Sequence, residues 1–312
     1  MKEPSVSILV LNWNGKEVLK KCLSSLLKLT NYKNFKIVVV DNASADGSVE
    51  MVKKEFGKKV DLIINKQNLG FVKGNNIGIK YVMKKYKPDY VLLLNNDTEI
   101  VDKDWLKKLV VTAEAEKKIG IIGPRLIFPN GRNQWCARKR ERNIFRLIIQ
   151  TLTASGNPGI GEKNVGWIGE ANTISGACMM IRSEMIKTLG LLDEELQPFF
   201  GEDVEYCFRA HRNGWKVYYR GDIEVIHKQS YTFQKLGIRR EKFYYSLRNG
   251  LKICKKYFGT KGLIVGLPVL LFSLFFERKN KERKLSLLNL KPRDNPFILI
   301  NMFIKIVKEV LR

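Results

Sequence analysis

Residues 35–44 read FKIVVVDNAS, a nearly unbroken aliphatic run that ends in an aspartate and a short polar segment. Runs of the same kind recur on both sides of it, separated by stretches whose apolar residues have helical spacing. They predict strands at 6–11, 35–40, 60–64 and 90–94, and helices at 16–29, 48–56 and 75–85. This alternation is typical of βα units. The predicted fold class is therefore α/β, with a Rossmann-like open sheet that is mostly parallel and carries helices on both faces.

A polar segment follows each of these four strands. The segments are Asn12-Trp13-Asn14-Gly15, Asp41-Asn42-Ala43-Ser44, residues 65–74, and Asn95-Asn96-Asp97-Thr98. Any one of them could serve only a turn. In open α/β sheets, however, ligands bind beyond the carboxyl ends of the strands, where all four segments would meet. We therefore predict a shared ligand site at this edge of the sheet.

The composition excludes several classes of protein. The chain has 312 residues with 56 Lys and Arg, 31 Asp and Glu and two His, a formal net charge of +25. Hydrophobic residues make up 45%, enough for a substantial core, so wholesale disorder is excluded. The five cysteines are scattered without a CxxC pair, which argues against a disulfide framework or a zinc ribbon and favours a reducing cytosol. The apolar run at 6–11 is too short for a signal peptide.

The second half of the sequence is less regular. Between about Arg125 and Trp167 we expect a long excursion with some helix around 144–152. A strand is then predicted at 174–181, followed by a short helix at 183–189 that Ser183 would cap. Another helix is predicted from Glu202 or Asp203 to Asn213-Gly214, and two strands follow it at 216–219 and 224–227.

The strand-end residues suggest a metal rather than a phosphate-binding loop. The chain lacks both GxGxxG and GxxxxGK[ST], which argues against a dinucleotide-binding fold and a P-loop nucleotidase. A divalent metal on a strand-end carboxylate is another way to neutralise the diphosphate of a ligand. Asp97 is the best such carboxylate, and His227 could add a nitrogen ligand that suits Mn²⁺. A single strand-end histidine could equally be structural, so both interpretations stay open at this point.

Nine segments, taken together, resemble glycosyltransferase family 2 in its rhamnosyltransferase-like branch. They are SILVLNWNG, VVVDNASADGS, NLGFVKGNNIGI, LLLNNDTEI, GPRL, SGACMMIRSEM, FFGEDVEYCFRAHRNGW, VIH and YYSLRN, and they span roughly residues 4–250. The resemblance implies a GT-A fold, a nucleotide-sugar donor, a divalent metal (Mn²⁺ or Mg²⁺) and inversion at the anomeric carbon. Such an enzyme would move a sugar, with rhamnose as the first candidate, to a saccharide or lipid-linked saccharide in cell-surface glycan assembly.

The resemblance also implies roles in donor binding. The segment around Trp13 would line the nucleotide pocket, with Trp13 stacked on the base, and Asp41 would hydrogen-bond the base or ribose. The other residues implied in donor binding are Asn12, Asn14, Asn68, Gly70, Lys73, Asn75, Asn96 and Gly176. The segment Asn95-Asn96-Asp97 stands where the family has its DxD motif, so Asp97 is left as the anionic metal ligand, with His227 as its partner.

The catalytic acid–base group is implied in the same way. Gly201-Glu202-Asp203 match the ED motif of the family, in which the aspartate takes the proton of the acceptor hydroxyl. Asp203 is accordingly the predicted general base, and Glu202 is the second choice. From the residues alone, the two acids could instead stabilise the N-terminus of the predicted helix. Cys178 is expected to pack in the core and not to act as a nucleophile.

Three other functions fit parts of the sequence. A basic chain with scattered aromatic residues could bind nucleic acid, but no nucleic-acid-binding motif occurs and the lysines lie along helix faces, so we predict no such partner. A non-catalytic sugar-nucleotide-binding protein would not need the full set of acids described above. A sugar-nucleotide pyrophosphorylase would not explain the GED and YYSLRN segments. The sequence makes no prediction about the oligomeric state.

The positive charge is concentrated near the C-terminus. Residues 228–312 contain 20 Lys and Arg against 5 Asp and Glu, together with apolar runs at 262–276 and 296–304. The longer run falls short of the ~20 residues of a membrane-spanning helix. We predict a glycosyltransferase domain at 1–250 and a helical, basic and apolar tail at 251–312 that binds an anionic membrane surface. The enzyme would then be cytoplasmic and peripheral on the inner face of the cell membrane; the alternative is a helical pair packed on the first domain.

Overall fold

The computed structural model describes residues 3–134, 136–139, 141, 143–153, 166–228, 239–275 and 296–311. The chain divides into two compact units. Unit 1 comprises Met1–Arg140, Pro158–Pro198 and Glu202–Thr232, and unit 2 comprises Glu141–Asn157, Phe199–Gly201 and Phe233–Arg312.

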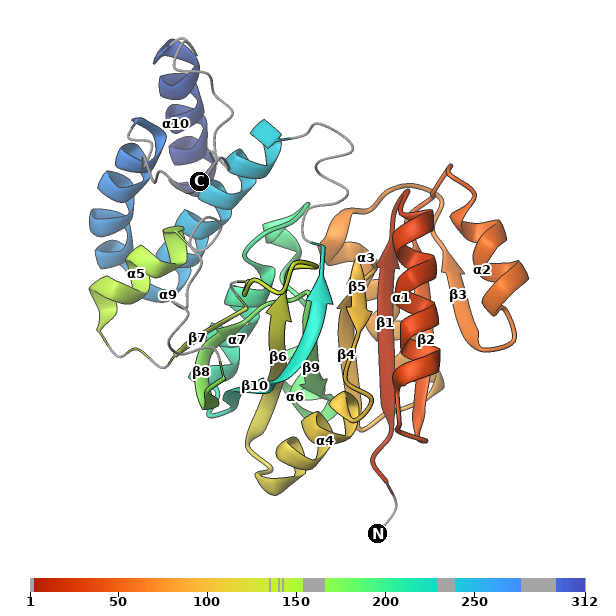
Figure 1. The fold of residues 1–312 in the computed structure, drawn as a ribbon. Coiled ribbons are helices and arrows are strands. Elements are labelled where there is room, and N and C mark those ends of the chain that lie inside the picture. Colours follow the sequence, from red (N-terminus) through yellow and green to blue (C-terminus); the bar gives the residue numbers. More distant parts are fainter. Residues whose placement is uncertain are drawn as a thin grey trace. The chain divides into compact units, whose positions relative to one another are not determined.

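Unit 1 is built on a ten-stranded sheet (Figure 1). Its strands are β1 (Val6–Asn12), β2 (Phe35–Asp41), β3 (Val60–Ile64), β4 (Tyr90–Asn95), β5 (Thr98–Ile100), β6 (Ile119–Ile127), β7 (Ala137–Lys139), β8 (Ile168–Ile174), β9 (Cys178–Arg182) and β10 (Lys216–His227). Their order is β3-β2-β1-β4-β9-β6-β10-β8-β7, and β5 pairs with β10 outside this path. The four strands β3, β2, β1 and β4 are parallel to one another, and β6 is parallel to β10. β9, which lies between β4 and β6, is antiparallel to both.

The helices of unit 1 connect these strands. They are α1 (Lys16–Leu29), α2 (Ser48–Phe56), α3 (Gly70–Lys85), α4 (Trp105–Ala115), α6 (Ser183–Leu189), the 3₁₀ helix η2 (Glu194–Leu196) and α7 (Glu202–Arg212). α1 and α3 lie on opposite faces of the sheet (Figure 1). The predicted α/β class, with a mostly parallel central sheet flanked by helices, is confirmed.

The parallel strands end at a common edge because their hydrogen-bonded registers coincide. In the ladder between β1 and β2, Asn12 lies beside Asp41, and in the ladder between β1 and β4, Leu11 lies beside Asn95. β1 is apolar on both faces because helices cover both, and its side chains from Val6 to Val10 are buried. The polar segments that follow these strands are thereby brought together, as the sequence predicted.

Several elements differ from those expected. The predicted strand at 174–181 is two strands, β8 and β9, because a tight turn at Ser175, with the Cys178 N–H 3.3 Å from the Ser175 carbonyl oxygen, interrupts the run between them. The two strands predicted at 216–219 and 224–227 are one strand, β10, with a register shift between Arg220 and Glu224. α3 begins at Gly70 and not at residue 75. Ser183 does not cap α6: it is the first residue of the helix, and Arg182 occupies the capping position.

The described residues of unit 2 form the helices α5 (Ile144–Thr153), α9 (Arg239–Phe275) and α10 (Pro296–Leu311). α9 is interrupted at Gly259, whose φ of 57° is not helical. The three helices share an apolar cluster of Ile148, Leu152, Leu247, Leu251, Cys254, Leu270, Ile306 and Val310. The last segment of unit 1 ends at Thr232, and α5 groups with the C-terminal helices in unit 2. The predicted domains at 1–250 and 251–312, and a membrane role for the second, stay predictions.

Among the described residues, none of the helices offers an apolar stretch of the length that a bilayer crossing requires. All five cysteines are free and buried, and burial raises the pKa of the Cys22 and Cys254 thiols to about 12. Cys178 is a core residue of β9, as expected, and burial raises the pKa of its thiol as well.

Candidate functional site

The ends of β1, β2 and β4 are joined by a buried network of polar side chains. Asn12 Nδ2 donates to Asp41 Oδ2 at 2.9 Å, and Asn96 Nδ2 donates to Asn12 Oδ1 at 2.7 Å. Ser44 adds two bonds to the same carboxylate, one from its N–H to Asp41 Oδ1 at 2.7 Å and one from its Oγ to Asp41 Oδ2 at 2.8 Å. This network connects three predicted donor-binding residues in a chain, in which Asn96 bonds to Asn12 and Asn12 bonds to the Asp41 carboxylate.

The loop after β1 is held by the loop after β2. The Asn14 N–H donates to Ser44 Oγ at 2.9 Å, and Asn14 Oδ1 accepts from the Ala45 N–H at 2.8 Å. Asn14 has a φ of 50°, a left-handed conformation that asparagine tolerates better than most residues. Trp13 lies between these anchored residues and is partly exposed. Asp41 itself is about 1% exposed, so in the structure it organises this loop; its expected bond to the base or ribose stays a prediction.

The segment before α3 closes on the same edge. Asn42 Nδ2 donates to Asn68 Oδ1 at 3.2 Å and to the Gly70 carbonyl oxygen at 3.0 Å. Gly70 has a φ of +74°, and a Cβ there would lie 2.9 Å from the Pro198 carbonyl oxygen, so glycine is required on both counts. Lys73 is exposed in the first turn of α3, whereas Asn75 is buried, with its Nδ2 bonded to the Phe71 carbonyl oxygen at 2.9 Å.

Asp97 and His227 meet at the ends of β4 and β10. His227 Nε2 lies 3.2 Å from Asp97 Oδ1 and 3.2 Å from Asn95 Nδ2. The other ring nitrogen, Nδ1, lies 2.8 Å from Gln134 Oε1, and Gln134 Nε2 donates to the His227 carbonyl oxygen. Asp97 and His227 are both buried, so the structure brings the two predicted metal ligands together.

This pair fits a divalent cation in part. Two ligands at right angles around Mg²⁺, each about 2.1 Å from the ion, lie roughly 3 Å apart, close to the separation of Asp97 Oδ1 and His227 Nε2. One carboxylate oxygen with one imidazole nitrogen also suits Mn²⁺. Within the described ranges, no group of three or more His, Cys, Asp or Glu side chains is placed to hold a metal. The remaining ligands would therefore have to be water and oxygens of a bound diphosphate.

Asp203 lies in the first turn of α7, with both carboxylate oxygens held by backbone N–H groups. Oδ2 accepts from the Gly176 N–H at 2.9 Å, and Oδ1 accepts from the Val204 N–H at 2.8 Å. Desolvation raises the pKa of Asp203, and these two hydrogen bonds act in the opposite direction. Its side chain is partly exposed, whereas Glu202, the second choice for the base, is buried in the same turn.

Asp203 reaches the edge of the sheet through the turn between β8 and β9. The next residue after Gly176, Ala177, accepts with its carbonyl oxygen from the Asn95 N–H at 3.0 Å. A Cβ on Gly176 would lie 3.8 Å from Asp203 Oδ2 and 3.8 Å from the Phe71 ring, in ordinary van der Waals contact with both, so Gly176 adjoins the carboxylate and the first turn of α3. Hydrogen bonds thus connect Asp203, the turn after β8 and the end of β4.

Two residues of the site were not singled out from the sequence. Ser44, which completes the Asp41 network, lay in a segment that the sequence assigned to the edge, so its position was expected but its role was not. Gln134 follows an irregular stretch after β6, and it carried no sequence signal because its contact with His227 spans 93 positions of the chain. Asn95 is a third surprise, since its amide contacts the His227 ring where the family motif would place a carboxylate.

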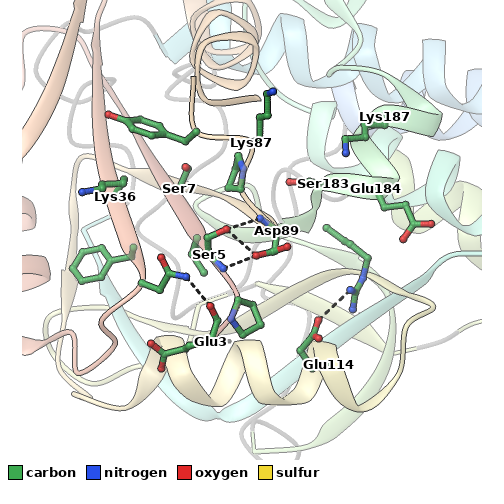
Figure 2. A pocket seen from close by; sticks show the side chains of 17 residues that line it. Glu3, Ser5, Ser7, Lys36, Lys87, Asp89, Glu114, Ser183, Glu184 and Lys187 are labelled. Atoms are coloured by element: carbon green, nitrogen blue, oxygen red, sulfur yellow. Dashed lines mark hydrogen bonds and ion pairs between the residues drawn. The ribbon is translucent and has the colours of Figure 1, made fainter. Parts of the chain in front are cut away.

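A cavity lies near the residues that precede β1, β2 and β4, at the other end of these strands (Figure 2). This cavity of about 760 Å³ is lined by residues near the beginnings of β1, β2 and β4, among them Ser5, Lys36 and Asp89. Several of its polar groups bind one another: Ser5 Oγ donates to Asp89 Oδ2 at 2.8 Å, and Arg182 forms an ion pair with Glu114 at 3.2 Å. Because open α/β sheets bind ligands at the carboxyl ends of their strands, we place the functional site at the edge with Asp41 and Asp97.

Comparisons with known sequences show to which proteins the chain is similar. The sequence model of the family described as "Glycosyltransferase like family 2" matches residues 4–246. The dTDP-rhamnosyl transferase RfbF of Shigella flexneri is 26% identical over 263 residues, which cover 81% of this chain and 81% of that protein. The low-salt glycan biosynthesis hexosyltransferase Agl10 of Haloferax volcanii is 27% identical over 224 residues, which cover 72% of this chain and 67% of that protein. The O-antigen biosynthesis protein RfbC of Myxococcus xanthus is 26% identical over 241 residues, but this chain spans just 17% of that protein's length.

Solved structures show the same fold. TarS 1-349 of S. aureus, in complex with UDP-GlcNAc, has a TM-score of 0.62 at 20% identity and covers 98% of this chain and 81% of its own. The mannosyltransferase PcManGT of Pyrobaculum calidifontis, in complex with GDP-Man and Mn²⁺, has a TM-score of 0.58 at 14% identity. The match covers 100% of this chain and 88% of that one. These similarities confirm the expected GT-A fold. Together with the match over residues 4–246, they establish that the chain belongs to glycosyltransferase family 2.

Proposed function

We propose that this protein is an inverting glycosyltransferase that moves a sugar from a nucleoside-diphosphate donor to a hydroxyl of a saccharide or lipid-linked saccharide. The observation that carries the proposal is the position of Asp203. Its carboxylate is oriented by the Gly176 N–H, and the turn that holds it is bonded to the end of β4, two residues before Asp97. A base and a pair of metal-ligand side chains therefore adjoin one sheet edge, as a single displacement requires.

In the proposed reaction, Asp203 acts on the acceptor. The acceptor hydroxyl gives its proton to the Asp203 carboxylate while its oxygen bonds to the anomeric carbon and the bond from that carbon to the diphosphate oxygen breaks. Burial raises the pKa of Asp203, and a raised pKa makes the carboxylate a stronger base at neutral pH. The Gly176 and Val204 N–H groups keep both oxygens in one orientation. Attack from the side opposite the diphosphate inverts the configuration.

The other edge residues would bind the donor. Trp13 is partly exposed and would stack on the base, while the Asn12–Asp41–Asn96 network fixes the floor of the nucleotide pocket. Lys73 is exposed in the first turn of α3, where a cation and a helix N-terminus both favour a phosphate. Asp97 and His227 would hold a divalent cation, which supplies charge neutralisation for the departing diphosphate.

A donor screen tests this function. The full chain is incubated with Mn²⁺ and one of several nucleotide sugars, and its thermal unfolding is measured. dTDP-rhamnose is the first donor to test because the Shigella relative is named a dTDP-rhamnosyl transferase. A true donor at 100 times its Kd should raise the free energy of unfolding by about 2.7 kcal/mol. The stabilising donor is then supplied with a lipid-linked saccharide, and the product's anomeric configuration is determined by NMR.

The outcomes separate the competing functions. Transfer with inverted configuration is the expected result. Stabilisation by a nucleotide sugar without transfer or hydrolysis would instead indicate a binding protein, and retained configuration would contradict the single displacement. If no nucleotide sugar stabilises the protein and nucleic acid does, the proposed function is wrong.

We further propose that unit 2 docks on an anionic membrane surface. Its three helices bury one apolar face in their shared cluster, yet each also exposes large apolar side chains at helical spacing. Most of the exposed large apolar side chains in the described parts of the chain belong to this unit: Phe145, Ile149, Ile264, Leu271, Ile300, Ile304 and Leu311. The surplus of Lys and Arg after residue 228 would attract anionic lipids to these faces.

Substitutions on α10 test the membrane proposal without truncating the cluster. Ile300 and Ile304 are each 42% exposed, so the double variant Ile300→Asn/Ile304→Asn should fold normally but lose apolar contact with lipid. Burying an isoleucine side chain contributes about 1.5–3 kcal/mol, so flotation with anionic liposomes should weaken at least about tenfold. Val111→Asn on α4, where Val111 is 59% exposed, is the matched control and should float like the wild type. Equal flotation of the double variant and the wild type would contradict the proposal.

A further inference from the structure

Gln134 lies in a hairpin that folds back on the end of β6. Its N–H donates to the Leu126 carbonyl oxygen at 2.9 Å, and the neighbouring residue Asn133 bridges to Ile127. The side chain is about 5% exposed. Both polar atoms of its amide contact His227, at the end of β10: Nε2 donates to the carbonyl oxygen, and Oε1 faces ring atom Nδ1 at 2.8 Å.

The polarity of these two contacts determines where the ring proton lies. A backbone carbonyl oxygen can only accept, so the contact with the His227 carbonyl oxygen must come from the amide nitrogen of Gln134. The amide oxygen, which can only accept, is then the atom that faces Nδ1. Nδ1 must therefore carry a hydrogen, and in a neutral ring Nε2 is left with its lone pair.

On the opposite side of the ring, the contact with Asn95 agrees with this assignment, because Asn95 Nδ2, a donor, lies 3.2 Å from Nε2 and the Nε2 lone pair can accept from it. Asp97 Oδ1, an acceptor, also lies 3.2 Å from Nε2. The lone pair and the carboxylate oxygen repel each other, and a cation bound by both would relieve that repulsion. A protonated ring would also satisfy Gln134 and Asp97, but it would set an Nε2–H against the donor of Asn95.

We propose that Gln134 is a positioning residue that holds His227 in the tautomer with hydrogen on Nδ1, so that the Nε2 lone pair and Asp97 form a ready cation-binding pair. Hydrogen bonds to the distal nitrogen of a ligating histidine orient the ring and raise its basicity. The proposal rests on the roles proposed above for Asp97 and His227. Its first test, however, is independent of any metal.

That test uses NMR of metal-free protein labelled with ¹⁵N-histidine, recorded at a pH where the rings are neutral. The chain has two histidines, and they should show opposite tautomers, because His211 Nε2 lies 3.1 Å from the Ala171 carbonyl oxygen and must donate to it. His227→Gln identifies the two sets of signals. The wild type should show His227 with hydrogen on Nδ1, and Gln134→Leu should shift that ring to a mixture of tautomers. The matched control Asn130→Ala removes an amide from the exposed turn of the same hairpin and should leave the tautomer unchanged.

A second measurement is the affinity for Mn²⁺ alone, followed by water proton relaxation. Gln134→Leu should bind Mn²⁺ about 10–100-fold more weakly, the usual effect of losing such a partner, while Asn130→Ala binds like the wild type. An Nε2–H tautomer in the wild type, or an unchanged tautomer in Gln134→Leu, would overturn the proposal. If the tautomers behave as expected and neither protein binds Mn²⁺, the positioning by Gln134 stands and the metal role of Asp97 and His227 fails.

Discussion

Replacing Asp203 with asparagine should slow sugar transfer by about two to four orders of magnitude while donor binding stays nearly unchanged. Asparagine keeps the shape of the side chain but cannot take the proton of the acceptor hydroxyl. The donor network around Asp41 involves other residues, so it has no reason to change. The measurements are the single-turnover rate of transfer and the calorimetric Kd of the donor.

The matched control for this substitution is Asp104→Asn. Asp104 precedes the first residue of α4, as Asp203 lies in the first turn of α7, and its side chain accepts from Asn31 Nδ2 at 3.1 Å on the surface. The Asp104→Asn variant should transfer sugar like the wild type. A large loss in Glu202→Gln together with activity in Asp203→Asn would move the base to Glu202.

The same loss should follow protonation of Asp203. A base works in its ionised form, and burial raises the pKa of Asp203 above the ordinary value of 3.8. As the pH falls, kcat/KM of the wild type should therefore decline earlier than it would for a solvent-exposed aspartate. The residual activity of Asp203→Asn should lack this acid limb.

Asp97→Ala should abolish the part of donor affinity that depends on a divalent metal. Within the Asp97–His227 pair, Asp97 supplies the negative charge, and His227 alone is a weak site for a hard cation. Calorimetry of the donor with and without Mn²⁺ should show a difference of about 100-fold or more in the wild type and almost none in the variant.

Glu99→Gln is the control for loss of a nearby carboxylate. Glu99 lies two residues further along, in β5, and pairs with Lys228 at 2.7 Å. The Glu99→Gln variant should bind the donor more tightly with Mn²⁺ than without it, as the wild type does. Equal enhancement by Mn²⁺ in the wild type and in Asp97→Ala would remove Asp97 from the metal site, and thermal unfolding of both variants checks that they are folded.

The first half of the fold was predictable because local signals agree with one another there. β1 to β4 are apolar runs bounded by polar segments, and α1 and α2 begin and end at the residues that their spacing predicts. The convergence of Asn12, Asp41 and Asn96 follows from parallel pairing, which brings the carboxyl ends of neighbouring strands to one edge.

The second half depends on contacts that a sequence does not display. The run 174–181 looks like one strand because Gly176 and Ala177 are small and uncharged, yet they form the turn that carries Asp203 to the edge. Gln134 reaches His227 from a segment without periodicity, and no local pattern marks such a pair. The role of Asp203 was inferred through the family resemblance, whereas His227 was first noted as an imidazole at a strand end; the residues alone left each of them with a structural alternative.

The pairing of β5 with β10 determines how far apart Asp97 and His227, the proposed metal ligands, lie. In that antiparallel ladder His227 is opposite Thr98, the residue that follows Asp97. Their separation is thus set by backbone hydrogen bonds within a sheet and not by the conformation of a flexible loop. A slip of one residue would turn His227 to the other face. Loops that contact the acceptor can consequently change in length and sequence while the ligand spacing is conserved, so acceptor choice and metal geometry can evolve separately in this fold.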